Sequence, residues 1–389
     1  MSRLLRGLSA IVVGALGLVL LGEAPAWAYP QWQLSTGAVR CNQCHYAPAG
    51  GGLLTSYGRD AAGEQLSTFG GDGAFLHGAV TLPSPLALGG DFRGAFVAND
   101  VQDPNGPTVA VFPMQLDLDA RVALPLGFSV TATGGFRDQV RSPNTLVPIQ
   151  NYQPIDTSAF ISRQHFATWQ PQATGPYVRV GRFYAPFGLR FPEHIYYIER
   201  DLGFDETEET YNVSAGFIYD ELELHLTMFA PDFVRHIGSN ASGLAMLFVH
   251  RLADDRAELA GQARLALSPG VTRLIYGGYG KAYVEPVRTL FYAEVDGVQL
   301  LFDDPIVGTR NQVVGLAGFT VLPIPSLMLT LIGERNQIDV DLPSAWTAAD
   351  ALINWFPYAH GEIQLMGRLQ FPTGGAAAKT LFIQLHYYL

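Results

Sequence analysis

The sequence has few charged residues and no long apolar segment after its first 28 residues. Lys, Arg, Asp and Glu make up 15% of the chain, whereas a soluble domain usually carries about 25%. No later apolar run reaches the roughly 18 residues that a helix needs to cross a bilayer. The formal net charge of −11 argues against binding nucleic acid or an anionic surface through a basic patch. The same charge would attract cations.

The sequence also lacks the short motifs of common enzyme classes. There is no nucleophile elbow, no glycine loop that cradles phosphate and no metalloprotease helix with two histidines. Hydrolytic and phosphoryl-transfer chemistry are therefore not indicated.

Cysteine is almost absent, and both copies lie in one stretch, Cys41-Asn42-Gln43-Cys44-His45. This spacing is typical of a c-type haem attachment motif, in which two thiols bond the porphyrin vinyl groups and the histidine becomes an axial iron ligand. We therefore predict one covalently attached haem c. Cys41 and Cys44 are the predicted attachment residues, and His45 is the predicted proximal ligand of the haem iron.

Two other uses of these thiols stay open at this stage. A disulfide between them would close a very small loop and stabilise little. A redox-active dithiol needs a strand and helix context that the surrounding sequence does not show. A zinc site would need further thiol or imidazole ligands at short spacing, and none lies close by in the sequence.

The first 28 residues have the features of a secretory signal peptide. Arg3 and Arg6 precede an apolar run over residues 8–21, and Ala26-Trp27-Ala28 supplies small residues at the cleavage positions. Export would carry the chain to the side of the inner membrane on which haem is attached.

Residues 29–80 form the predicted monohaem cytochrome c segment. This stretch is glycine-rich, and it lacks the amphipathic helices with which a separate cytochrome would surround its cofactor. About 50 residues are too few to bury a haem alone. We expect the segment to use the rest of the molecule as walls, acting as a plug in or under it.

Residues 81–389 alternate apolar with polar or small residues in segments of about ten residues that end at Gly, Pro, Asn or Asp. For example, Leu116 and Leu118 share one face of a predicted strand, and Asp117 and Asp119 share the other. Such strands present one face to lipid and one to water or a plug. Sixteen starts are predicted, near Leu86, Val109, Phe128, Ala159, Tyr177, Tyr211, Glu221, Gly243, Glu258, Thr272, Thr289, Asn311, Leu327, Ala351, Glu362 and Lys379.

The links between these segments alternate between short and long, with one exception at Ser268-Pro269-Gly270. Bacterial outer-membrane barrels have an even number of strands, short periplasmic turns and longer outer loops. We therefore predict an all-β fold, a transmembrane antiparallel β-barrel of about 16 strands, in the outer membrane of a Gram-negative-type bacterium. Its amino-terminal end would face the periplasm. A soluble β-sandwich or propeller is the alternative.

The chain resembles the fused outer-membrane monohaem cytochrome-porins associated with bacterial iron oxidation. The resemblance rests on the order of signal peptide, haem segment and porin-like barrel, and on Thr36-Gly37, Pro48 and residues 53–59 around the haem motif. It implies one-electron transfer from an extracellular reductant, which the resemblance suggests is ferrous iron, to a periplasmic acceptor such as a soluble cytochrome. The activity would be at most that of a ferrous-iron-oxidising oxidoreductase. Residues 181–190 also resemble a strand of phosphate-selective porins.

The sequence does not fix the distal haem ligand or the residues around the haem. His77 is the candidate nearest in sequence, and the others, which have lumen-facing parity in predicted strands, are His225, Met328, Met366 and His386. Arg40, Tyr57 and Arg59 are candidates for contacts with the haem propionates. The acidic run over residues 201–211 would suit ferrous ions. For each of these the alternative is an ordinary lumen or surface side chain.

Two further functions remain open. One is a diffusion porin whose lumen is narrowed by a haem-bearing plug. The other is a structural or sensory haem protein without net electron flow.

Overall fold

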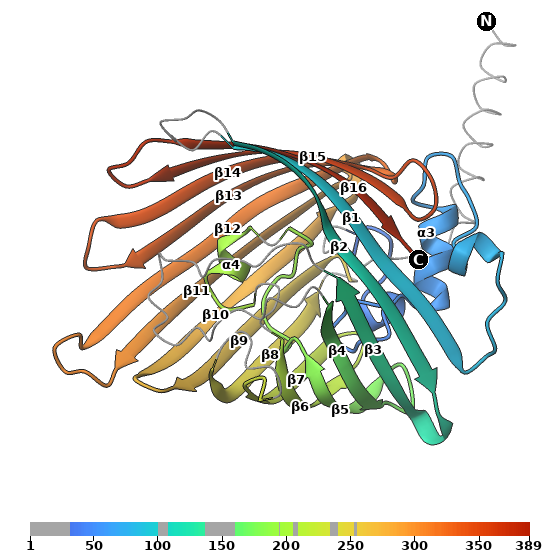
Figure 1. The fold of residues 1–389 in the computed structure, drawn as a ribbon, viewed down its shortest axis with the longest axis horizontal. Helices are drawn as coiled ribbons and strands as arrows, with labels where there is room; N and C mark the ends of the chain where they lie inside the picture. The colour runs from blue at the N-terminus through green and yellow to red at the C-terminus, as the bar shows by residue number, and fades with distance from the viewer. Residues whose placement is uncertain are drawn as a thin grey trace, which may run out of the picture.

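Sixteen antiparallel strands close into a barrel in the computed structural model (Figure 1), which describes residues 32–99, 108–136, 160–193, 195–204, 209–233, 240–252 and 255–389. Strand β1 pairs with β2 and β16, and every other strand pairs with its neighbours in sequence. The predicted signal peptide lies outside the described residues. Among those described, no helix is long and apolar enough to cross a membrane.

The strands are β1 (Leu86–Asn99), β2 (Thr108–Ala123), β3 (Phe128–Phe136), β4 (Phe160–Trp169), β5 (Gly175–Phe183), β6 (Thr210–Ile218), β7 (Leu222–Ala230), β8 (Ser242–Leu252), β9 (Ala257–Ser268), β10 (Val271–Val284), β11 (Thr289–Phe302), β12 (Thr309–Ile324), β13 (Leu327–Asp339), β14 (Ser344–Trp355), β15 (Gly361–Pro372) and β16 (Ala378–Tyr388). All predicted starts but one lie within two residues of these. The exception is Ala351, because β14 begins at Ser344 and the preceding link is correspondingly shorter than predicted.

The barrel has an apolar outer face and a polar inner face, as the alternating sequence predicts. On β15, the outward side chains of Leu365 and Leu369 are 40% and 42% exposed, whereas Gln364 and Arg368 are 2% and 3% exposed. Burial of the polar face means that the lumen is filled with protein. Exposure of the apolar face matches the surface that a barrel presents to lipid.

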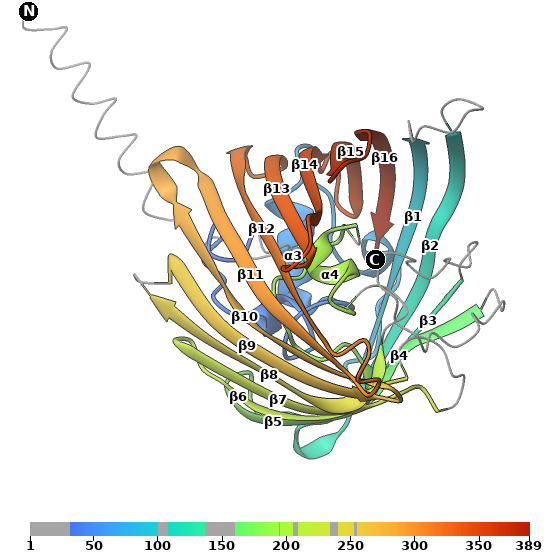
Figure 2. The same ribbon diagram turned by 90° about the vertical axis from the view of Figure 1, so that its left-hand side faces the viewer.

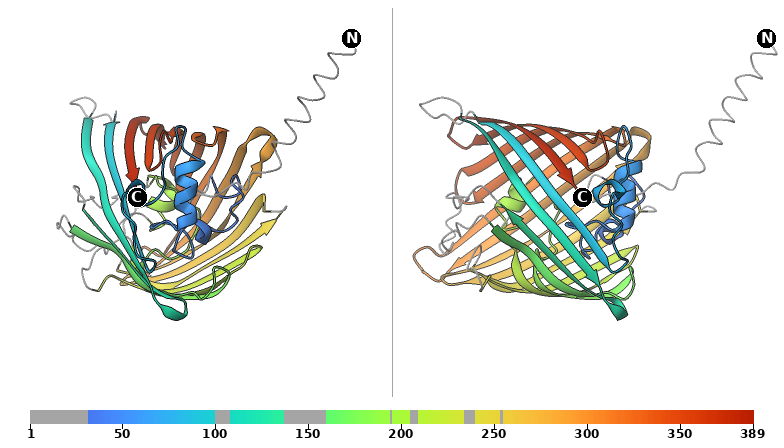
Figure 3. Two further views of the ribbon diagram at one scale, coloured as in Figure 1. Left: turned by 90° about the vertical axis from the view of Figure 1, so that its right-hand side faces the viewer. Right: turned by 45° about the vertical axis from the view of Figure 1, so that its right-hand side comes forward.

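The amino-terminal segment lies at the end of the barrel that carries the short turns. It contains α2 (Cys41–Cys44), α3 (Ser56–Glu64) and the 3₁₀ turn η1 (Phe75–Gly78), and Figure 3 shows α3 across this mouth. Two further 3₁₀ turns, η2 (Pro125–Gly127) and η3 (Glu285–Val287), lie between strands.

Four contacts tie the segment to short links between other strands, those of β4–β5, β6–β7 and β14–β15. Asn42 Nδ2 donates to the carbonyl of Ala173 at 2.7 Å, and the backbone N–H of Thr68 donates to the carbonyl of Phe356 at 2.9 Å. Arg40 also pairs with Asp220 at 3.0 Å. Trp32 packs on Phe356 with ring centroids 4.5 Å apart.

The link between β5 and β6 is described at residues 184–193, 195–204 and 209; it enters the lumen and carries α4 (Tyr197–Arg200). Figure 2, viewed from the long-loop end, shows α4 inside the barrel. The backbone N–H of Leu189 donates to Glu294 at 2.6 Å, and that of Tyr197 donates to Glu334 at 2.5 Å. Lumen carboxylates from distant strands thus bind backbone donors of this link, which is one of the longer links of the barrel. We call the described residues of this link the inward loop.

Candidate functional site

The two thiols of the Cys-x-x-Cys-His motif lie on one helical turn, α2. The two sulfur atoms are not joined in a disulfide. Gln43 Oε1 accepts hydrogen bonds from the backbone N–H groups of Val39 and Arg40, at 2.8 and 3.0 Å, which caps the start of this turn. Burial raises the pKa of both Cys41 and Cys44 to about 12, so both side chains are neutral thiols in this state.

His45 is held in one orientation by the loop that follows it. Its Nδ1 lies 2.9 Å from the carbonyl oxygen of Gly52. A carbonyl only accepts, so Nδ1 carries the proton and Nε2 has a free lone pair. Nε2 is buried and has no hydrogen-bond partner among the described residues. A metal-bound histidine usually has this arrangement, with one ring nitrogen donated to a carbonyl and the other on the metal.

The residues after the motif fold back onto α2. Thr55 caps α3 by accepting from the N–H of Gly58 at 3.1 Å, and its own N–H donates to the carbonyl of Cys44 at 2.8 Å. A side chain at Gly58 would place Cβ 2.5 Å from that carbonyl oxygen. The sequence Leu-Thr-Ser-Tyr-Gly over residues 54–58 therefore builds a helix that packs directly on the motif.

Cys41, Cys44 and His45 line one cavity of about 350 Å³ inside the barrel. This volume falls in the range of about 300–1,000 Å³ usual for small-molecule and cofactor sites. Residues 184–192 of the inward loop also line it, as do lumen side chains from several strands. The site is thus composed of the amino-terminal segment, the inward loop and the barrel wall.

Ion pairs organise the wall of this cavity. Asp91 binds Arg93 at 2.8 Å, and Glu258 binds Lys281 at 3.0 Å. Lys281 also donates to the Gln33 side chain, and Gln33 Nε2 donates to Glu258 at 3.0 Å. This last group joins the amino-terminal segment to β9 and β10.

The cavity contains two of the histidines considered as distal ligands. His225 has Tyr177 Oη 2.8 Å from Nδ1 and Glu223 Oε2 3.0 Å from Nε2. His386 has Glu362 Oε2 2.7 Å from Nδ1 and Asp91 Oδ1 3.2 Å from Nε2. Both line the cavity, and both rings are already hydrogen-bonded.

The other distal candidates lie elsewhere. His77 is exposed, its Nε2 is 3.1 Å from Tyr387 Oη, and its ring contacts His360 with centroids 4.5 Å apart. Met328 packs in an apolar cluster between the barrel and the amino-terminal segment. Met366 is buried but does not line the cavity.

The three residues considered for propionate contacts have other surroundings. Arg40 lines the cavity but pairs with Asp220. Arg59 donates to the carbonyl of Leu88, and Tyr57 is 40% exposed. In the acidic run, residues 205–208 lie outside the described residues.

The two acidic side chains described at the ends of that run are buried in ion pairs. Asp201 binds Arg200 at 2.9 Å, and Glu209 lies 3.6 Å from Arg163 and 3.5 Å from Arg182. Neither one is an exposed ligand for a cation in solution.

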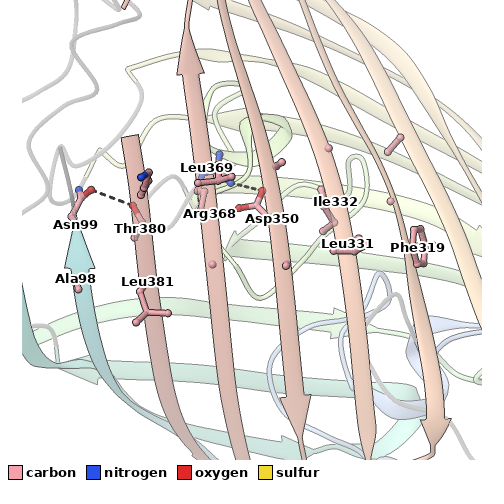
Figure 4. Close-up of a pocket in the computed structure, with 17 residues that line it drawn as sticks. Ala98, Asn99, Phe319, Leu331, Ile332, Asp350, Arg368, Leu369, Thr380 and Leu381 are labelled. Atoms are coloured by element: carbon pink, nitrogen blue, oxygen red, sulfur yellow. Dashed lines mark hydrogen bonds and ion pairs between the residues drawn. The ribbon is translucent and has the colours of Figure 1, made fainter. Parts of the chain in front are cut away.

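A larger groove, of about 940 Å³, lies on the outer wall and is far from this chemistry (Figure 4). Outward residues such as Leu331, Leu369 and Leu381 line it. Arg368 and Asp350, which also belong to its lining, are buried and bind each other at 2.8 Å. We interpret this groove as lipid-facing surface.

Comparisons with known proteins show the barrel fold. No protein-family model and no curated protein matches this chain. Among solved structures, a loop L8 deletion mutant of OmpT, an outer membrane protein of Vibrio cholerae, is 9% identical, covers 78% of this chain and 99% of its own, and has a TM-score of 0.59. The anion-selective porin from Comamonas acidovorans is 7% identical, with coverages of 78% and 99% and a TM-score of 0.56.

The outer membrane channel DcaP of Acinetobacter baumannii is 11% identical, covers 78% of this chain and 97% of its own, and has a TM-score of 0.54. At such low identity, these likenesses show that the chain has a porin-like barrel. The resemblance to cytochrome-porin fusions remains a proposal.

The residues in the cavity fit a c-type haem. Two thiols on one helical turn and a neutral imidazole with a free, buried Nε2 share a protein-lined space. The sequence did not reveal that the inward loop lines this space. The only available signal was the porin-like stretch over residues 181–190, which leads directly into it.

Proposed function

We propose that this chain is an outer-membrane protein that holds one covalent haem c inside a porin-like barrel and transfers single electrons between an extracellular donor and the periplasm. The observation that carries the proposal is the arrangement of Cys41, Cys44 and His45 Nε2 on one cavity within the lumen. The haem would supply an iron centre that alternates between the ferric and ferrous states.

The protein residues would fix this centre and limit its contact with water. Cys41 and Cys44 would form the thioether bonds, and His45 Nε2 would bind the iron. Gly52 holds the imidazole by accepting from Nδ1. The inward loop covers the cavity with residues 184–192, which would reduce solvent access and influence the reduction potential.

The position of the site suits transfer across a membrane. An apolar band about 25 Å tall separates the two sides of such a barrel. The cavity lies in the lumen, and the amino-terminal segment lies at the short-turn end. Short turns face the periplasm in bacterial barrels, so we infer that the haem segment faces a periplasmic acceptor, such as a soluble cytochrome.

Ferrous iron is the donor that we propose, on the basis of the family resemblance and the net charge of −11. The reaction would remove one electron from Fe²⁺ and give Fe³⁺, and the periplasmic acceptor would take that electron. The chain would then be a ferrous-iron-oxidising oxidoreductase.

The second candidate function is a channel, because solved structures of similar fold include an outer membrane channel and an anion-selective porin. The filled lumen favours electron transfer over free diffusion. The inward loop packs on the barrel wall in one buried apolar cluster, to which it contributes Phe187, Phe191, Tyr196 and Tyr197.

The first experiment is an anaerobic stopped-flow visible spectrum of the purified, detergent-solubilised protein mixed with ferrous iron. We expect a reduced c-type α-band, and its absence in the Cys41→Ser/Cys44→Ser variant. A band that forms with dithionite but never with iron would leave the haem and reject iron as donor. Absence of any c-type band in the wild-type protein would overturn the electron-transfer proposal.

Planar-bilayer conductance separates the two candidate functions. An electron conduit with a filled lumen should pass little ionic current, whereas a diffusion porin should conduct in its native state. A large, stable conductance would favour the channel.

A further inference from the structure

Most charged side chains around the cavity are matched in ion pairs. Asp91 binds Arg93 at 2.8 Å, and Asp117 binds Arg163 at 2.6 Å. The other pairs are Glu223 with Arg251, Glu258 with Lys281 and Asp220 with Arg40. Seven cationic side chains line the cavity: Arg40, Arg93, Arg163, Arg179, Arg190, Arg251 and Lys281. The ion pairs above account for five of them.

The remaining two cations are Arg179 and Arg190. Among the described residues, neither forms an ion pair with a carboxylate. The one lining side-chain carboxylate outside these pairs is Asp119, which accepts a hydrogen bond from Thr133 at 2.5 Å and interacts with Arg163 and Arg59. Within the described part of the chain, the cavity therefore has two guanidinium groups that no side-chain carboxylate pairs with.

Arg179 is buried between two aromatic rings. Its side chain extends from β5, and the residue is 4% exposed. The guanidinium carbon lies 3.9 Å from the ring centroid of Phe166 and 3.7 Å from that of Phe183. Its hydrogen bond to Gln164 is long at 3.5 Å, and its Nε has no partner among the described residues.

Arg190 reaches the same cavity from the inward loop. Its guanidinium carbon lies 4.0 Å from the ring centroid of Tyr184, and Nη1 is buried without a hydrogen-bond partner among the described residues. Both arginines are thus held by stacking on aromatic faces, which leaves the N–H groups at the guanidinium edges available.

A buried cation without a counter-charge is costly, because it loses hydration without an electrostatic return. Guanidinium groups match planar or tetrahedral oxyanions, which they bind through paired N–H donors. Two such groups facing one cavity would be stabilised by a ligand that brings negatively charged oxygens. Aromatic stacking fixes the groups in advance, so little side-chain entropy would be lost on binding.

We propose that Arg179 and Arg190 form an oxyanion-binding subsite of this cavity, which takes carboxylate or phosphate oxygens. In the haem-loaded protein these oxygens belong to the two propionates. That assignment rests on the proposed function and replaces Arg40 and Arg59 as propionate partners. Without haem, the same subsite takes a free oxyanion such as inorganic phosphate.

The first arm of the test uses haem-loaded Arg179→Gln and Arg190→Gln proteins. The measurements are the midpoint potential, by spectroelectrochemistry, and the resonance Raman bands of the propionates. A nearby cation favours the reduced, less positive haem, so both variants should have lower potentials and shifted propionate bands. Lysine at either position should restore much of the potential. Arg288→Gln, whose side chain donates to the exposed carbonyl of Pro323, is the control and should change neither measurement.

The second arm uses the haem-free Cys41→Ser/Cys44→Ser protein, titrated with inorganic phosphate by calorimetry. We expect binding that Arg179→Gln or Arg190→Gln weakens about tenfold or more, because each change removes charge-assisted hydrogen bonds. The haem-loaded protein should not bind phosphate, since the propionates fill the subsite.

The two arms separate the outcomes. In one outcome, the haem-loaded protein binds phosphate through these arginines and the variants leave the propionate bands unchanged. That result would assign the subsite to a free anion and reject the propionate assignment. If the wild-type protein carries no haem, the proposed electron transfer fails, and phosphate binding still decides the subsite. In another outcome, the arginine variants change neither the midpoint potential nor the Raman bands, and phosphate binding does not depend on the arginines. That result would overturn the subsite itself.

Discussion

The Nδ1 atom of His45 lies 2.9 Å from the carbonyl oxygen of Gly52, seven residues later in the chain. This contact sets the imidazole so that Nε2 is the free nitrogen. The turn that brings the carbonyl back passes through Gly50, Gly51 and Gly52, all with positive φ, at 82°, 82° and 66°. A metal-binding nitrogen is therefore positioned by backbone geometry that side chains at these positions would oppose.

The first prediction compares Gly50→Ala with Gly51→Ala. Both residues have φ of +82°, so each change carries a similar backbone cost of about 1–2 kcal/mol. Only at Gly50 would the new Cβ meet another atom, 2.9 Å from Cys41 Cβ, whereas nothing lies within 4 Å at Gly51. Gly50→Ala should therefore lower covalent haem per polypeptide more strongly, as measured by the pyridine haemochromogen spectrum. Equal losses in the two variants would contradict this account.

The second prediction concerns the attachment of the amino-terminal segment to the barrel. Lys281→Met removes the cation that binds Glu258 at 3.0 Å and donates to Gln33. Removing one partner of a buried ion pair costs about 3–5 kcal/mol, although Arg251 at 3.5 Å remains to offset part of the charge on Glu258. We expect faster proteolysis of residues 32–80 in detergent and an intact barrel.

The matched control for Lys281→Met is a change in an exposed ion pair. Glu285 and Arg256 are 2.9 Å apart, with side chains 68% and 44% exposed, and such pairs contribute only about 0–1 kcal/mol. Glu285→Gln should leave proteolysis unchanged. If both variants release the segment equally, the buried network does not anchor it.

The barrel could be predicted from sequence because its two faces meet different environments. Leu116 and Leu118 alternate with Asp117 and Asp119, and this period of two is enough to fix a strand with one apolar face. The start of β14 was missed because residues 344–350 are mostly small or weakly patterned. Here pairing with β13 and β15 extends the strand, and that pairing depends on residues distant in sequence.

The third prediction is a pH dependence that comes from Glu193 in the inward loop. Burial, and then the nearby Glu362 carboxylate, raises the pKa of Glu193 to about 8, so the folded protein favours the protonated form. This contribution to stability is present in full below the usual glutamate pKa of about 4.3. It is lost as the pH rises through about 8.

The thermal unfolding midpoint in detergent, measured from pH 5 to 9, tests the role of Glu193. We expect the unfolding midpoint of the wild-type protein to fall between pH 5 and 8. Glu193→Gln should remove part of this fall, because its amide does not ionise. Glu285→Gln, with a side chain that is 68% exposed, should follow the wild-type curve. A decline that is identical in all three proteins would assign it to other groups.

The candidate site could be predicted only where it is local in sequence. Cys41, Cys44 and His45 form a contiguous motif with a fixed chemical meaning. Arg179 and Arg190 enter the same cavity because β5 has its place in the closed sheet and the next loop turns inward. That turn depends on hydrogen bonds to Glu294 and Glu334, which are more than a hundred residues away, and no local pattern encodes it.

The fourth prediction tests whether the inward loop closes the lumen. Phe191 is 4% exposed and contacts Tyr196 and Tyr292, with ring centroids 5.2 and 5.4 Å apart. Phe191→Ala removes this packing, at a cost of about 3–5 kcal/mol, and leaves space that water and ions can enter. We expect low single-channel conductance for the wild-type protein in planar bilayers and a higher or more frequent open level for Phe191→Ala.

The control for Phe191→Ala is Phe371→Ala, which makes the same chemical change on the outer face of β15. Phe371 is 46% exposed there, so its loss should not alter ionic current. The c-type α-band should survive in both variants, because neither residue belongs to the Cys-x-x-Cys-His motif. A wild-type conductance already as large as that of Phe191→Ala would mean that the lumen is open despite the buried aromatic cluster, and diffusion would then be the better account of the barrel.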